Sequence, residues 1–109
     1  LVFHGQTQKN LGSFAHHEAF VTAYDELDPL IDDFIEIYQG KKGKLMANGT
    51  FNIALHNLDE NPEAFIDEFV EYLVNIVPQR LDDADTDLLN IRDEMLAILN
   101  QTKYRLHMM

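Results

Sequence analysis

The sequence lacks several features, and each absence excludes a class of protein. There is no cysteine among its 109 residues, so a disulfide framework and a thiolate zinc site are both excluded. No apolar run approaches the roughly 20 residues that a membrane-spanning helix needs, and no signal-peptide pattern is visible. We therefore expect a cytoplasmic protein that does not associate with membranes.

Basic residues are also scarce. The chain has 8 Lys and Arg against 19 Asp and Glu, which gives a formal net charge of −11. Such a chain repels phosphate backbones, and no basic tail offsets that repulsion. The basic residues Lys41, Lys42 and Lys44 cluster beside Gly40 and Gly43, and this segment is predicted to be a solvated loop. Direct binding of nucleic acid is therefore not expected.

The hydrophobic pattern of the chain is mainly helical. The composition, 46% hydrophobic and 25% charged, fits one small globular domain over residues 1–109. Apolar residues recur every three or four positions, and no strand alternation or internal repeat stands out. The pattern predicts an all-α bundle of four principal helices, the first of them short. A domain of this size buries well under three quarters of its chain surface, so oligomerisation would help its stability.

The first two helices are predicted from the N-terminal 40 residues. Residues 1–4 resemble the tail of a helix that ends in the polar stretch 6–12. Ser13 is a plausible N-cap for a second helix that stops at Gly40. Pro29 either bends this helix or starts a new one capped by Asp28, and we favour a kinked, continuous helix.

The second half of the chain predicts three further elements. Residues 50–58 are expected to form a short connecting helix. Asn61, Pro62 and Glu63 provide a cap, a first-turn proline and a first-turn acid for the next helix, which Pro78 closes. A last helix is predicted from about residues 85–87 to about residue 107.

Four side chains in the first third of the chain are candidate metal ligands: His4, His17, Asp32 and Glu36. Imidazole nitrogens and carboxylate oxygens are the ligands that non-haem iron, manganese and zinc accept. Asp32 and Glu36 lie four residues apart and therefore share one helix face. His17 lies fifteen residues before Asp32, about 22 Å along a straight helix. One metal ion cannot bridge that distance, so another segment or another subunit must complete the site.

A twofold dimer could bring these residues together. If the first two helices are antiparallel neighbours, His4 and His17 lie close to one another. An antiparallel copy of the second helix would then supply its Asp32 and Glu36 to them, and a symmetric dimer would hold two such sites. His16 competes with His17 for the role but fits the spacing less well. In the alternative interpretation, the histidines are ordinary polar residues and the two acids belong to a solvated face.

An acidic segment further along the chain has a partial resemblance to an EF-hand loop. Asp83, Asp85 and Asp87 alternate, and Glu94 stands at the twelfth position. However, Leu88 occupies the place where a glycine permits the sharp turn of a calcium loop. Acids at the start of a helix are explained by capping and by the helix dipole, so calcium binding is not expected.

The first 40 residues also carry a family pattern. It consists of the runs His17-Glu18-Ala19-Phe20, Tyr24-Asp25-Glu26-Leu27, Ile31-Asp32-Asp33-Phe34-Ile35-Glu36 and Tyr38-Gln39-Gly40. They resemble helix two of Dps-type miniferritins, and resemble even more the short Dps-like proteins of tailed bacteriophages. The resemblance covers about residues 3–40.

The resemblance implies both a fold and a function. The fold would be a ferritin-like four-helix bundle with a shortened first helix and a short connecting helix between helices two and three. His4, His17, Asp32 and Glu36 are the positions that match the family's intersubunit ferroxidase site. The implied function is oxidation and storage of Fe(II), with manganese and zinc as alternative metals, in a homodimer or larger homo-oligomer. The competing hypothesis is a phage-related, non-enzymatic helical bundle with a structural or interaction role and a vestigial metal site. If the protein is phage-encoded, we expect it in the host cytoplasm or in the virion.

Overall fold

All secondary structure in the described part of the chain is helical. The computed structural model describes residues 2–43 and 62–108, with side chains over 15–43 and 63–108. The helices are α1 (Val2–Lys42), α3 (Pro62–Glu71) and α4 (Thr86–Met108). A π-helical turn, η2 (Tyr72–Ile76), and a 3-10 turn, η3 (Val77–Arg80), continue α3. The predicted all-α class is confirmed for these residues, which form three helical rods.

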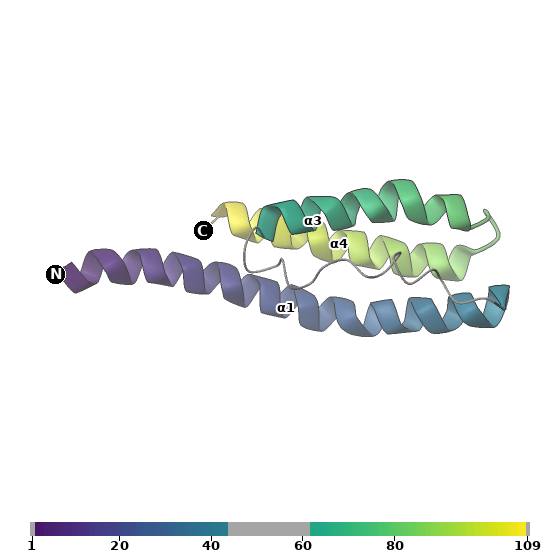
Figure 1. Ribbon diagram of the computed structural model, residues 1–109, viewed down its shortest axis with the longest axis horizontal. Coiled ribbons are helices and arrows are strands. Elements are labelled where there is room, and N and C mark those ends of the chain that lie inside the picture. Colours follow the sequence, from purple (N-terminus) through teal and green to yellow (C-terminus); the bar gives the residue numbers. More distant parts are fainter. Residues whose placement is uncertain (1, 44–61, 109) are drawn as a thin grey trace.

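The three rods pack lengthwise. Helix α4 packs against both α1 and α3 and runs antiparallel to them (Figure 1). Helix α1 has 41 residues and α4 has 23, so α1 is longer by about 27 Å at 1.5 Å per residue. The N-terminal part of α1 therefore projects past the ends of α3 and α4 (Figure 1). None of the described helices combines the length and the apolarity needed to cross a membrane.

The core lies between these rods and is built from apolar residues of all three. Helix α1 contributes residues spaced by three, four or seven, which places them on one face. The aromatic rings of α3 pack beside them, and Phe65 and Phe69 meet edge to face with centroids 6.0 Å apart. The buried apolar residues include Phe20, Leu27, Phe34, Tyr38, Phe65, Phe69, Leu73, Leu88, Met95, Leu99 and Leu106.

The break predicted between the first two helices does not occur. Residues 6–12 continue α1 without interruption, and Ser13 lies inside the helix. The stretch contains two glutamines, one lysine and one leucine, which are good helix formers, and no proline precedes Pro29. Polarity alone therefore does not end the helix. The expectation of a separate, short first helix is wrong for the described backbone.

Helix α1 also passes through Pro29, as predicted. It ends at Lys42, two residues beyond the predicted stop at Gly40. The residue that ends it is Gly43, whose φ of 66° lies in the left-handed region. Its N–H donates to the carbonyl oxygen of Gln39 at 2.9 Å, which is the αL form of helix termination.

Pro78 does not end its helix as predicted, because the chain stays helical to the end of η3. Proline lacks an N–H and clashes with the carbonyl four residues before it in a regular α-helix. The turn before Pro78 is a wider π-helical turn rather than a regular α-helical one. In it, the Val77 N–H donates to the Tyr72 carbonyl oxygen, five residues back. The carbonyl oxygen of Leu73 accepts a hydrogen bond from Arg92 Nη1 at 3.1 Å.

The last helix begins and ends within about one residue of its prediction. The predicted connecting helix over residues 50–58 lies outside the described residues. The described rods are therefore three, and the four-helix, ferritin-like arrangement stays a prediction.

Candidate metal-binding face of helix α1

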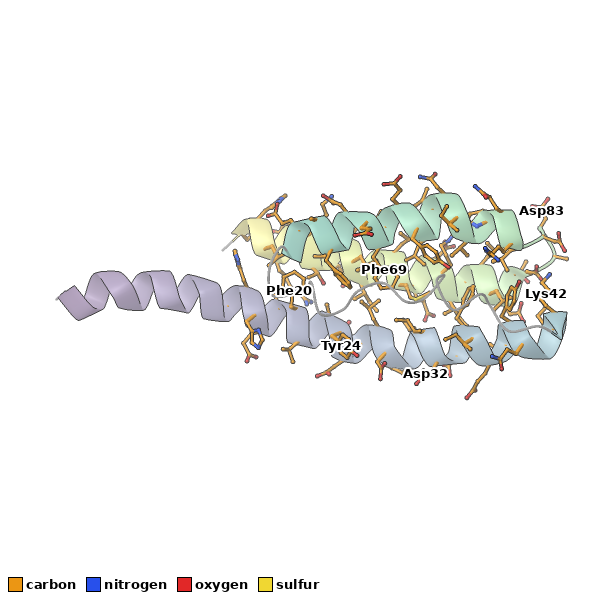
Figure 2. All side chains as sticks on the ribbon, in the orientation of Figure 1. Phe20, Tyr24, Asp32, Lys42, Phe69 and Asp83 are labelled. Atoms are coloured by element: carbon orange, nitrogen blue, oxygen red, sulfur yellow. The ribbon has the colours of Figure 1, made fainter. Side chains whose placement is uncertain are left out.

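Helix α1 presents opposite faces to the bundle and to solvent. Phe34 is fully buried against the other rods, whereas Asp32 and Glu36 on either side of it are exposed. Because successive residues are rotated by about 100°, positions 32 and 36 lie about 160° from Phe34 in either direction. Figure 2 shows Asp32 on the side of α1 that faces away from α3 and α4. The two carboxylates therefore share the outward face, as the spacing predicted.

His17 is exposed on α1, whereas its neighbour His16 is half-buried. The exposure distinguishes the two histidines that compete for the predicted role, because His16 is in line with Phe20 and Phe34 on the core side. His17 remains about 22 Å from Asp32 along the helix axis. Among the described residues, no group of three or more histidine, aspartate or glutamate side chains could hold a metal ion. The described residues of one chain therefore do not assemble the predicted metal site.

His4 belongs to the same continuous helix as His17. Thirteen residues of α-helix separate the two positions by about 20 Å. The predicted approach of His4 to His17 through a turn is therefore wrong for the described backbone. The side chain of His4 lies outside the described residues.

Two large apolar side chains are exposed on α1 between His17 and Asp32. Val21 is 40% exposed and Tyr24 is 37% exposed. Tyr24 also borders an apolar pocket between α1, α3 and α4, whose cavity volume is about 30 Å³. Ligand pockets for organic molecules are typically about 300–1,000 Å³. This pocket is therefore too small to be an organic-ligand site.

A compact ion-pair cluster joins the end of α1 to the start of α4. The side chain of Asp85 is only 5% exposed, and its carboxylate forms ion pairs with both lysines. Lys41 Nζ lies 2.9 Å from Oδ1, and Lys42 Nζ lies 2.7 Å from Oδ2. The backbone N–H of Asp82 donates to the same carboxylate at 2.7 Å. Lys41 also reaches Asp87 at 2.7 Å. The labelled residues Lys42 and Asp83 lie at this end of the bundle in Figure 2.

The cluster shifts the pKa of its members in the directions that favour their charged forms. The Asp82 N–H and then the two lysines hold the pKa of Asp85 well below its usual range. Lys41 likewise lowers the pKa of Asp87. Hydrogen bonds to these carboxylates raise the pKa of Lys41 and of Lys42. The charges of the cluster are therefore paired with one another, and these ion pairs link the end of α1 to the start of α4.

This cluster corrects one prediction and agrees with another. Lys41 and Lys42 are the last residues of α1 rather than part of a solvated loop, and Lys44 lies outside the described residues. Asp85 directly precedes α4, as expected for an acid at a helix start. Its carboxylate, however, accepts hydrogen bonds from two ammonium groups and from the Asp82 N–H rather than from the first turn of α4. The pairing of these lysines with Asp85 was not predicted from the sequence. A signal for it was present, because lysines at the end of one helix and acids at the start of another both complement helix dipoles.

Comparison with known proteins gives one match. No curated protein and no solved structure matches the chain. Residues 4–106 match DUF5856, which is described as a family of unknown function. That match covers nearly the whole sequence, and the chain therefore belongs to the DUF5856 family.

Proposed function

We propose that this protein binds and oxidises Fe(II) at a site shared between two copies of the chain, with Asp32 and Glu36 from one copy and His17 from the other. The observation that carries the proposal is the shared, outward-facing position of Asp32 and Glu36 on α1. Two carboxylates one turn apart can hold one divalent cation. An imidazole from a second chain would complete a mixed nitrogen and oxygen ligand set suited to iron.

The donor chemistry fits iron as a substrate. Carboxylate and imidazole ligands would leave coordination positions open to dioxygen, which accepts the one electron that each Fe(II) loses, and carboxylates favour the higher charge of Fe(III). Manganese and zinc accept the same donors and are the alternative metals. Storage of the product would need a larger homo-oligomer, which the Dps-like resemblance implies. His4, which the resemblance implied as a further ligand, is not part of the proposed site, because α1 places it about 20 Å from His17.

The test is aerobic oxidation of Fe(II), followed by ferric absorbance. We expect the unmodified protein to exceed the buffer rate and Asp32→Asn/Glu36→Gln to fall to it, because the charged oxygens are lost while the size is kept. The matched control is Asp83→Asn/Glu94→Gln, which makes the same chemical change at two exposed acids outside α1. Calorimetry with Mn(II) should show at least about tenfold weaker binding for the first pair only.

Two results would contradict the proposal: a parent protein no faster than buffer, or a ligand variant as fast as its parent. The first result would favour the competing function, a non-enzymatic structural or interaction protein. The exposed apolar residues Val21 and Tyr24 support that second candidate, because they suit a protein contact whether or not metal is bound.

A further inference from the structure

We infer that the pocket between α1, α3 and α4 is a docking site for a basic amphipathic helix of a partner protein. The partner inserts one apolar side chain into the pocket and places Lys or Arg residues against acids at its rim. The inference goes beyond the proposed function, because it concerns the flank of α1 that faces α3 and does not depend on metal. It gives the second candidate function a partner of defined chemistry.

The pocket can hold part of one apolar side chain. Its lining is mainly apolar and comes from all three helices, including Phe20, Phe69 and Leu99. Its volume of about 30 Å³ exceeds the roughly 10–15 Å³ that one water molecule needs. Tyr24 and Asp28 also line the pocket and are exposed, so it opens to solvent beside them. Phe20, Tyr24 and Phe69 are labelled in Figure 2.

Apolar surface continues outside the pocket along one flank of α1. Successive residues of this flank are spaced by three or four positions, and they are Val21, Tyr24, Asp28, Ile31 and Ile35. The first two are exposed apolar residues and the two isoleucines are half-buried. An amphipathic helix presents its own apolar residues at the same spacing when it docks on such a surface. The spacing therefore fits a helical partner.

The helices on either side of the pocket are strongly acidic. Residues 10–40 of α1 contain seven Asp and Glu and no Lys or Arg, and residues 62–76 contain four and none. At the rim, Asp28 is exposed on α1, and Glu68, three residues after Phe65, is exposed on α3. Neither carboxylate forms an ion pair with another described residue. Complementary charge across an interface speeds association and selects the partner, so a basic partner fits this rim.

The basic residues of the chain itself do not neutralise this rim within the described fold. Lys41, Lys42 and Lys103 are paired with aspartates elsewhere. Residues 45–58 contain no Lys or Arg. The positive charge opposite the rim therefore comes from another protein.

A synthetic peptide tests the pocket, and a tryptophan in it is a specific probe because the chain has none. The peptide has about 16 residues, or four helical turns, with Trp and Leu spaced by three or four positions and Lys elsewhere. Its fluorescence should shift to the blue on binding, as the indole leaves water. Its affinity should fall at least about tenfold between about 0.05 M and 0.5 M salt, because salt screens exposed charges.

Two control peptides separate pattern from composition. One has the same residues in scrambled order, and the other has Glu in place of Lys. Both should bind at least about tenfold more weakly than the probe, because the first lacks an apolar face and the second is repelled by the rim. Equal binding of either control peptide, or no binding of the probe, would overturn the inference.

A pair of tyrosine variants locates the apolar contact. Tyr24→Ala should weaken binding of the probe at least about tenfold. Tyr104→Ala makes the same change at an exposed tyrosine that does not line the pocket and should bind as the parent does. Equal effects of the two variants would contradict the docking site. A change in the oligomeric state of Tyr24→Ala in light scattering would assign this flank to a second copy of the chain, and that result would also overturn the inference.

A pair of charge variants locates the rim. Asp28→Asn/Glu68→Gln should weaken binding and reduce its salt dependence, whereas the control Asp83→Asn/Glu94→Gln should do neither. Circular dichroism checks that all variants remain helical. Equal salt dependence of the two double variants would contradict the role of the rim. Fe(II) oxidation by Asp28→Asn/Glu68→Gln should equal that of the parent, and a parent that binds the probe without oxidising Fe(II) would overturn only the proposed function.

Discussion

The two faces of helix α1 belong to one continuous helix and differ in what they contact. On the inward face, Phe34 has no exposed surface and Tyr38 stacks near it with ring centroids 6.5 Å apart. On the outward face, Asp32 and Glu36 are exposed, and neither forms an ion pair with another described residue. The inward face is explained by the fold of one chain. The outward face is the one that carries the residues of the proposed site.

The acidic residues show the same contrast between buried and exposed positions. Asp85 is buried and its charge is met by two lysines and a backbone amide. Asp32 is exposed and forms no ion pair with another described residue. A buried carboxylate must be paired to be tolerated, whereas an exposed one costs little and remains available to bind a cation. Burial therefore separates structural acids from candidate ligands more clearly than residue type does.

The largest expected effect is on the inward face. Phe34→Ala removes a fully buried ring and should lower the free energy of unfolding by about 3–5 kcal/mol. Asp32→Ala, two residues away on the outward face, should change it by no more than about 0.5 kcal/mol. Urea denaturation of the two variants measures the difference. Similar losses for both would show that the outward face is packed within one chain.

The ion-pair cluster should give a pH dependence. The pKa of Asp85 is lower in the folded chain than its unfolded value of about 3.9. Its contribution to stability is therefore complete above about pH 5 and is lost as the pH falls below about 4. Asp85→Asn should reduce stability at pH 7 and make it less dependent on pH between 2 and 5.

Asp32→Asn is the control for that measurement, because it makes the same chemical change at an exposed acid outside the cluster. Urea midpoints measured from pH 2 to pH 7 report both variants. A parent-like slope for Asp85→Asn would show that the cluster does not stabilise the fold.

The smallest expected effect is at the end of α1. Gly43→Ala puts a side chain at a φ of 66° and should cost about 1–2 kcal/mol. Gly40→Ala is the control, because a Cβ at position 40 meets no atom within 4 Å and alanine favours the helix. Thermal unfolding should therefore rank Gly40→Ala at or above the parent and Gly43→Ala below it. The reverse order would place the end of α1 elsewhere.

Much of the fold could be predicted from local pattern. The class, the passage of α1 through Pro29 and the last helix follow from apolar spacing and helix propensity. The predicted stops at residues 6–12, Gly40 and Pro78 were wrong, because polar residues, a single glycine and a proline each permit helix when neighbouring contacts favour it. For the candidate site, the spacing predicted that Asp32 and Glu36 share a face, but it could not show which face.

The sequence by itself determined the helical periodicity, the excess of acids and the distance that separates His17 from Asp32, since these depend only on residue order and helix geometry. Tertiary structure decided which side of α1 is buried, because that depends on where α4 and α3 pack. It also decided that Lys41, Lys42 and Asp85 are partners, although 43 or more residues separate the lysines from the aspartate along the chain. Only packing brings those charges together, and only packing leaves the acids of the outward face exposed.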